Sequence, residues 1–197
     1  FPYTTLFRSI GRITKFDASD VSCQIAGEVK DFDISQYLPA KEARRMDSFI
    51  HYGIAGALQA IQDARLDEFT ELDKDRVGVN IGSGIGGLPL IEETSRNVVA
   101  GGARKINPFF IPGSLINLIS GHITILKGYR GHNYGIVSAC ASGTHAIGES
   151  ARLIKYGDVD VMIAGGAESA VCTLGVGGFA AMKALSTRHD DPAAASR

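Results

Sequence analysis

The residue in this sequence best placed to carry out chemistry is Cys140. It follows an apolar stretch, 134–139, that predicts a β-strand, and it precedes a helix predicted to begin near Ser142 and Gly143. Backbone N–H groups and the positive end of a helix dipole stabilise a thiolate, which is the nucleophilic form of cysteine. Because many cysteines that form no disulfide are buried structural residues, two interpretations stay open: Cys140 is a catalytic nucleophile, or it is a structural residue.

The small residues around Cys140 favour the first interpretation. Four small neighbours permit a tight turn between strand and helix and leave room for a substrate: Ala139, Ala141, Ser142 and Gly143. The same order of strand, nucleophile and helix underlies the nucleophile elbow of hydrolases, although the GxSxG pattern is absent here. Cys23 and Cys172 lack this setting, and we interpret both as structural.

A glycine-rich segment, 82–87 (GSGIGG), follows another predicted strand. It lacks the Lys-Ser/Thr pair of a P-loop, and its glycine spacing does not match GxGxxG. The five histidines are scattered, and His145 is expected to point away from the Cys140 thiol because it lies inside the helix that follows. Neither an HExxH motif nor a catalytic pair of carboxylates occurs. We therefore predict no metal and no cofactor.

Hydrophobic periodicity predicts the elements that would position Cys140. Apolar residues at three- and four-residue steps indicate a helix over 41–66, and alternation indicates a strand over 76–81. The remaining predicted elements are a helix through Leu90 and Ile91, a proline-bounded loop at 107–112, a buried helix at 114–126, a strand at 134–139, a helix at 142–156 and a strand at 159–164.

The last three of these elements form a βαβ unit, which predicts parallel strands joined by a right-handed crossover. Gly165 and Gly166 then end the second strand at the same sheet edge as Cys140. In α/β sheets, ligand-binding and active sites lie outside the carboxyl ends of the strands. The sequence therefore predicts an α/β fold whose functional site lies at that edge.

Composition narrows the class of protein. The chain has 197 residues, of which 45% are hydrophobic and 21% charged, as in ordinary globular proteins. Twenty basic and 21 acidic residues give a net charge of -1, which argues against nucleic acid or an anionic membrane as a partner. Three widely spaced cysteines and an N-terminus without a secretory signal predict a cytoplasmic protein.

Both ends of the chain differ from the rest. Residues 1–8 (FPYTTLFR) show no helix or strand pattern, and we interpret them as a non-native remnant of cloning or sequencing. The last residues, 186–197, form a polar stretch that contains a proline. We expect a chain truncated at both ends.

Segment 137–143 (VSACASG) resembles the nucleophile segment of β-ketoacyl-acyl-carrier-protein synthases, the condensing enzymes of fatty-acid synthesis. Further segments resemble the same family in the same order: 41–53 (KEARRMDSFIHYG), 82–87 (GSGIGG), 104–112 (RKINPFFIP), 157–168 (GDVDVMIAGGAE), 174–179 (LGVGGF) and 184–197 (ALSTRHDDPAAASR). Together they run from about Gly11 to Arg197. They look closest to synthase II, the type that acts on long chains.

The resemblance implies a thiolase-like, layered α/β fold with two similar halves, in which residues 9–197 form most of the first half. It also implies a homodimer and an acyl-carrier protein as partner. Cys140 would take the acyl group as a thioester, its own N–H would serve as an oxyanion donor, and malonyl-carrier protein would then lose carbon dioxide and extend the chain by two carbons. Ile85 would line the acyl pocket, and Phe110 would lie near both the pocket and the dimer seam.

The chain also departs from the family pattern. The family's first strand and glycine-rich turn are replaced by residues 1–8, and its two catalytic histidines and its lysine would lie beyond Arg197. We therefore expect this fragment to be inactive in condensation and poorly soluble. The alternatives that stay open are a thiolase or a polyketide ketosynthase of the same fold, and a non-catalytic structural α/β fragment.

Overall fold

The computed structural model describes residues 10–195, and the chain divides into two compact units. The larger unit is 34–169, and the smaller one combines 1–33 with 170–197. Segment 1–8, which we interpreted as a non-native remnant, lies outside the described residues.

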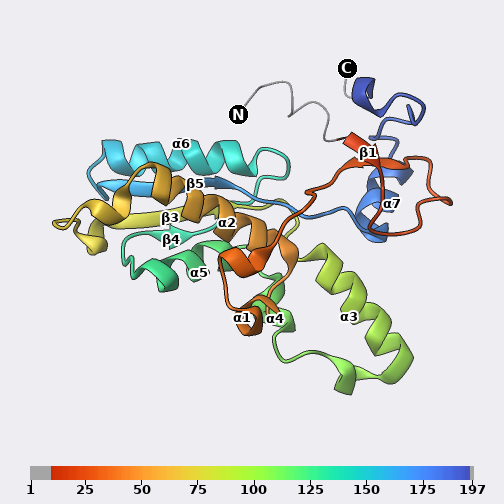
Figure 1. Ribbon diagram of the computed structural model, residues 1–197, viewed down its shortest axis with the longest axis horizontal. Helices are drawn as coiled ribbons and strands as arrows, with labels where there is room; N and C mark the ends of the chain where they lie inside the picture. Colours follow the sequence, from red (N-terminus) through yellow and green to blue (C-terminus); the bar gives the residue numbers. More distant parts are fainter. Residues whose placement is uncertain (1–9, 196–197) are drawn as a thin grey trace. The chain divides into compact units, whose positions relative to one another are not determined.

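A three-stranded parallel sheet forms the centre of the larger unit (Figure 1). The middle strand is β3 (Val77–Gly82), which pairs with β4 (Asn133–Tyr134) on one side and β5 (Val161–Gly166) on the other. The register between β3 and β5 runs from Val77 opposite Val161 to Gly82 opposite Gly166. The predicted parallel arrangement is therefore confirmed. The two strands of the predicted βαβ unit are not neighbours, however, because β3 lies between them.

Helices cover both faces of this sheet. Side chains alternate between the faces of a strand, and Val77, Val79 and Ile81 of β3 join the buried core with residues of α2 (Ser48–Asp63) and α5 (Leu118–Lys127). The residue between them, Asn80, donates a side-chain hydrogen bond of 3.1 Å to the carbonyl of Ala146. Ala146 belongs to α6 (Ser142–Lys155), which therefore lies on the other face, as Figure 1 shows. The predicted layered α/β architecture is confirmed.

The single helix predicted over 41–66 is wrong, because the structure has α1 (Ala40–Ala43) and then α2, with a break at Asp47. The Asp47 carboxylate accepts hydrogen bonds from Phe49 N at 3.2 Å and from Leu90 N at 2.8 Å. The Asp47 N–H donates to the carbonyl of Gly113 at 3.1 Å. Asp47 thus caps α2 and uses its backbone N–H outside the helix, so the helix has to begin there.

Other boundaries also differ from the prediction. Of the strand predicted at 134–139, only Tyr134 lies in the sheet, because β4 covers Asn133–Tyr134. The strand predicted at 159–164 begins two residues later, at Val161. The proline-bounded loop at 107–112 contains the start of a short helix, α4 (Phe110–Ser114). The remaining elements of this unit are α3 (Leu88–Gly101), η2 (Ile34–Gln36), η3 (Leu66–Glu68), η4 (Lys74–Arg76) and η5 (Ala103–Lys105).

The smaller unit has its own core. It contains an antiparallel pair, β1 (Ile10–Arg12) and β2 (Ile25–Gly27), with α7 (Thr173–Ala181) and η6 (Pro192–Ala194). Cys23, Ile25 and Val176 are buried together at its centre. The prediction that Cys23 is structural agrees with this position: its side chain is 3% exposed and its thiol donates to the carbonyl of Ile25 at 3.3 Å.

Candidate active site

Cys140 lies in a turn that joins the end of β4 to the start of α6, and its side chain is exposed. The turn is held from within by Ser142, the first residue of α6, which is 3% exposed. The Ser142 hydroxyl donates to the carbonyl of Ala139 at 2.7 Å and accepts from the N–H of Ser138 at 2.9 Å. A serine at this position therefore fixes the backbone on both sides of the cysteine.

The residue before Cys140 adopts a conformation that a residue with a Cβ rarely takes. Ala139 has a φ of 51°, in the left-handed region, which costs about 1–2 kcal/mol for a residue other than glycine. Such strain persists only where the surroundings enforce it, and here the backbone bonds from Ala141 N to Ser138 O and from Ser142 N to Ala139 O, both 3.1 Å, close the turn. The turn thus presents the Cys140 thiol at the amino end of α6, as in a nucleophile elbow.

The amino end of α6 supplies a favourable field for an anionic sulfur. The helix has 14 residues and no side chain caps its first turn, so its N–H groups and its dipole face the turn that carries Cys140. Thiolates at such positions are the reactive ones in proteins. The predicted position of Cys140 just before a helix is confirmed, whereas the strand before it, β4, ends at Tyr134 and does not reach the cysteine.

The glycine-rich loop after β3 packs directly against this turn. A Cβ placed on Gly82 would lie 2.7 Å from the carbonyl oxygen of Ile136 and 2.9 Å from that of Ser142. A Cβ on Gly84 would lie 3.1 Å from the carbonyl oxygen of Ala139. The glycines are therefore required by close backbone packing on the nucleophile turn, and this function replaces the phosphate-binding one that the motif could suggest.

Glu168 connects the ends of the two strands beside the nucleophile turn. It follows β5 by two residues, and its carboxylate accepts hydrogen bonds from Ser83 Oγ at 2.9 Å, Gly84 N at 2.7 Å and Ile85 N at 3.0 Å. The segments that follow β3, β4 and β5 thus meet at the carboxyl edge of the sheet, as predicted. The close approach of Gly143 to Gly166, 3.3 Å from a Cβ on Gly143 to the Cα of Gly166, joins the start of α6 to the end of β5.

Of the two predicted pocket residues, the structure places Ile85 nearer to the nucleophile. Ile85 adjoins Gly84, which packs on Ala139, and its side chain is 37% exposed. Phe110 begins α4 and is half-buried. The link between α4 and the glycine-rich loop is a backbone bond from Gly87 N to Ser114 O, 3.1 Å, at the other end of that short helix. The roles of Ile85 and Phe110 in binding remain predictions.

The histidines near this site have other partners. His145 Nδ1 lies 2.6 Å from Ser138 Oγ, so its ring is engaged with the residue two positions before the cysteine. His122, half-buried in α5, is less basic than usual, because burial lowers its pKa more strongly than the nearby Glu42 raises it. Within the described residues, neither histidine is hydrogen-bonded to Cys140.

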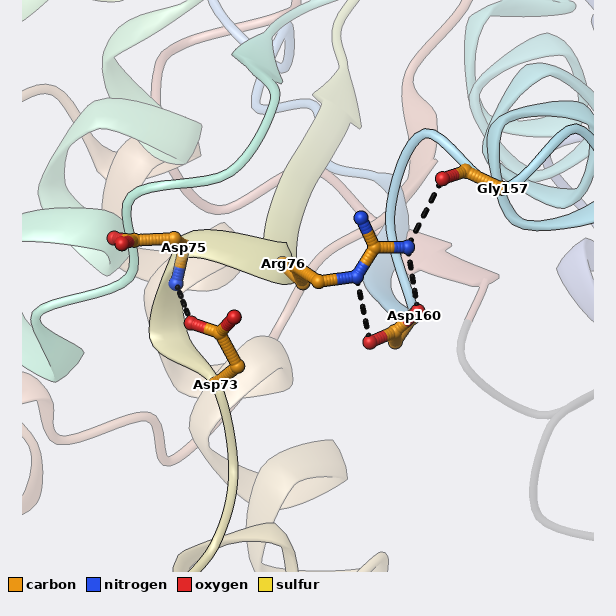
Figure 2. A network of polar contacts seen from close by, with 5 residues as sticks. All are labelled: Asp73, Asp75, Arg76, Gly157 and Asp160. Carbon is orange, nitrogen blue, oxygen red and sulfur yellow. Dashed lines mark hydrogen bonds and ion pairs between the residues drawn. The ribbon is translucent and has the colours of Figure 1, made fainter.

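A separate polar network closes the opposite end of the sheet, where β3 begins (Figure 2). The Arg76 guanidinium donates to both carboxylate oxygens of Asp160, at 2.8 and 2.7 Å, and to the carbonyl of Gly157 at 2.9 Å. The hydrogen bond from Arg76 holds the pKa of Asp160 below its usual value, and the same bond raises the pKa of Arg76. Because this network lies at the amino ends of the strands, we assign it a structural role.

We expect Asp160→Asn to lower the melting temperature slightly at pH 7. A carboxyl group whose pKa is depressed on folding stabilises the native state above its unfolded pKa of about 3.9, and this stability is lost as the pH falls through the folded pKa. The difference between variant and wild type should therefore shrink below about pH 4. Thermal unfolding at several pH values would test this, with Asp63→Asn at the exposed end of α2 as the control. A difference that grows on acidification would contradict the assignment.

Sequence reasoning did not identify Glu168 or Ser142 as residues of the site. Glu168 follows the predicted strand at the edge where Cys140 was expected, but the residues that it binds lie 83–85 positions earlier in the chain, so its position in the sequence assigns it no role. Ser142 gave no signal of its function, since a serine at the start of a helix is common.

Among residues 10–195, no group of three His, Cys, Asp or Glu side chains is arranged to hold a metal ion. No helix in the same range is long and apolar enough to cross a membrane.

Comparison with known proteins finds similarity to beta-ketoacyl synthases. The family model described as "Beta-ketoacyl synthase, N-terminal domain" matches residues 7–197. The 3-oxoacyl-[acyl-carrier-protein] synthase 2 of Vibrio harveyi is 52% identical over 188 residues, which cover 95% of this chain and 45% of that protein. The protein of the same name from Coxiella burnetii is 51% identical over 185 residues, covering 94% and 44%. The chain thus spans about half the length of these curated relatives.

Solved structures agree with the sequence relatives. A beta-ketoacyl synthase from Burkholderia phymatum matches with a TM-score of 0.81 and 25% identity over 93% of this chain and 45% of that one. A ketosynthase of a type II polyketide system, bound to its acyl-carrier protein, matches with a TM-score of 0.71 and 26% identity over 79% of this chain and 44% of that one. These neighbours support the thiolase-like fold that the sequence implied.

Proposed function

This chain belongs to the β-ketoacyl synthase family, and on that premise we propose that it carries the acyl-accepting nucleophile of a synthase II type condensing enzyme in fatty-acid elongation. Residues 9–197 would be most of the first of the two similar halves of such an enzyme. The observation that carries the proposal is the position of Cys140. It is exposed in a strained turn at the amino end of α6, and the glycine-rich loop that bears Ile85 packs against that turn.

The chemistry follows from that position. The Cys140 thiolate attacks the carbonyl carbon of an acyl thioester, and a new carbon–sulfur bond forms at Sγ. The bond to the carrier sulfur breaks, and the carrier leaves as a thiolate that takes up a proton from water. Covalent catalysis of this kind divides one difficult step into two easier ones. The Cys140 N–H is the donor in this chain for the oxyanion that develops on the thioester oxygen.

The second step belongs to the whole protein. Malonyl-carrier protein loses carbon dioxide, and the electron pair left on its carbon attacks the thioester carbonyl. A carbon–carbon bond forms while the Cys140 sulfur leaves as a thiolate. The product is an acyl chain longer by two carbons, and the nucleophile is regenerated.

The donor separates this proposal from a thiolase. We expect the chain to be acylated at Cys140 by an acyl group on acyl-carrier protein faster than by the same acyl group on coenzyme A, measured as the mass added to the intact chain over time. An acyl-carrier protein as partner is supported by the names of the curated relatives and by the ketosynthase complex described above. Faster transfer from coenzyme A would instead favour the thiolase interpretation.

We also propose that the protein forms a homodimer through the β4 edge of the sheet. β4 is an outer strand with two residues, and apolar side chains beside it are exposed: Val137, which follows β4, is 56% exposed, and Ile125 of α5, which packs on β4, is 77% exposed. Exposed apolar surface of this kind is typical of interaction sites.

A cytoplasmic location is supported by the three cysteines, which form no disulfide within the described residues.

We expect Ile125→Asp to convert the dimer to a monomer, because a charge buried in an apolar interface without a partner costs several kcal/mol. Sedimentation velocity at micromolar concentration would measure this. Val29→Asp, at another exposed apolar position, serves as the control and should leave the dimer intact. A wild-type protein that stays monomeric would contradict the proposed dimer.

A further inference from the structure

We infer that Glu168 is a positioning residue that sets the acyl-chain preference of Cys140, through the loop that carries Ile85. This inference rests on the proposed function, because it concerns which acyl groups the nucleophile accepts. It starts from a carboxylate whose hydrogen-bond partners all lie in a three-residue segment of another strand end, 83–85.

The two oxygens of Glu168 bind different parts of this loop. Oε2 accepts from two successive backbone N–H groups, those of Gly84 at 2.7 Å and Ile85 at 3.0 Å. Oε1 accepts from the Ser83 hydroxyl at 2.9 Å, and that hydroxyl in turn accepts from Gly86 N at 3.1 Å. Hydrogen bonds to an ionised acceptor are roughly twice as strong as neutral ones. One side chain thus fixes four consecutive residues of the loop.

The anchored loop adjoins both Glu168 and the nucleophile turn. The ideal Cβ position of Gly84 is 3.1 Å from Glu168 Oε2 and also 3.1 Å from the carbonyl oxygen of Ala139, the residue before Cys140. No space for a further carbon is left between Gly84 and the turn, and the three hydrogen bonds to Glu168 hold the loop in this closely packed position. Loss of the carboxylate would therefore let the loop move away from Cys140, and Ile85 would move with it.

A displaced Ile85 should change the transfer rates of acyl groups of different length by different amounts. Where Ile85 lines the channel for the acyl chain, its position decides how many carbons fit beyond the thioester. Hydrophobic pockets discriminate by about 10–200-fold for each methylene that they accept or reject. Loss of the Glu168 carboxylate should therefore alter the ratio of the transfer rates for long and short acyl chains, in addition to any change that affects both rates equally.

The test compares Glu168→Ala and Glu168→Gln with wild type, using octanoyl- and hexadecanoyl-carrier protein as acyl donors and the mass added to Cys140 as the readout. Alanine removes all three acceptor contacts. Glutamine keeps the shape but has one acceptor oxygen in place of two. We expect the hexadecanoyl-to-octanoyl rate ratio to change by about tenfold or more in the alanine variant, and by less in the glutamine variant.

Glu149→Gln is the matched control, since Glu149 is an exposed glutamate on α6 whose contact is a weak 3.6 Å ion pair with Arg152. It should leave the ratio unchanged. Amide hydrogen exchange of segment 82–88 gives an independent readout: exchange at Gly84 and Ile85 should accelerate in Glu168→Ala. Circular dichroism would confirm that each variant is folded.

The outcomes separate the two proposals. Equal slowing for both chain lengths, or an unchanged ratio together with unchanged exchange, would overturn the role of Glu168 while leaving the proposed function intact. Absence of acyl transfer to Cys140 in wild type as well as in all variants would instead overturn the proposed function, and with it the inference that rests on it.

Discussion

Replacement of Cys140 by serine should reduce acyl transfer to this chain by more than about 1,000-fold. A serine hydroxyl is almost entirely protonated at neutral pH and is a weak nucleophile unless a neighbouring base activates it, whereas a cysteine is partly ionised and intrinsically far more nucleophilic. Within residues 10–195, His145 Nδ1 is bound to Ser138 and no histidine is hydrogen-bonded to Cys140, so a serine here would lack the activating base that it needs. The rate of mass gain from an acyl thioester measures the effect.

The other cysteines provide the controls for this substitution. Cys23→Ser and Cys172→Ser should retain acyl transfer at Cys140, since Cys23 is buried in the smaller unit and Cys172 precedes α7. Cys23→Ser is also expected to destabilise the smaller unit, because it places a hydroxyl in an apolar core. Retained acylation in Cys140→Ser, or its loss in Cys172→Ser, would show that the nucleophile has been assigned to the wrong residue.

Gly82→Ala should damage both the stability and the reactivity of the site. The added Cβ would lie 2.7 Å from the carbonyl oxygen of Ile136 and 2.9 Å from that of Ser142. Both are backbone atoms of the segment that carries Cys140, so they cannot move aside without displacing the nucleophile turn. We expect a loss of about 1–3 kcal/mol in the free energy of unfolding. The acyl-transfer rate should fall by up to about 100-fold, as for a 1 Å misplacement of a reacting group.

Gly148→Ala is the matched control for this prediction. Gly148 lies inside α6, and a Cβ there would have no neighbour within 4 Å. Alanine in a helix interior should stabilise the protein by about 0.5–1 kcal/mol. Acyl transfer should stay unchanged. Chemical denaturation and the acylation assay together distinguish the two glycines, and equal effects at both positions would contradict the close packing at Gly82.

The parts of the fold that could be predicted from sequence are those with a local cause. The alternation in β3 and the apolar spacing in α6 are properties of consecutive residues, and both elements lie where the sequence placed them. The interruption before α2 has a distant cause. Asp47 is fixed by Leu90 and Gly113, which are 43 and 66 positions further along the chain. Periodicity in a short window carries no information about such contacts.

The same difference applies to the site. Cys140 could be identified because the signal, a thiol between a strand and a helix, is contained in a few adjacent residues. Glu168 could not, because its function depends on a loop that lies 83–85 positions earlier in the chain and meets it only when β3 and β5 pair in register. The family resemblance indicated the segment 157–168 but assigned no role to its last residue.

The central claim is that Cys140 alone among the three cysteines accepts an acyl group. The most direct test is to incubate the chain with an acyl group on acyl-carrier protein, digest it, and locate the thioester by mass spectrometry, with iodoacetamide labelling of a parallel sample to report thiol exposure. We predict a thioester on Cys140 and none on Cys23 or Cys172. Acyl groups distributed among the cysteines in the same proportions as the iodoacetamide label, or found on none of them, would contradict the assignment of Cys140 as the nucleophile.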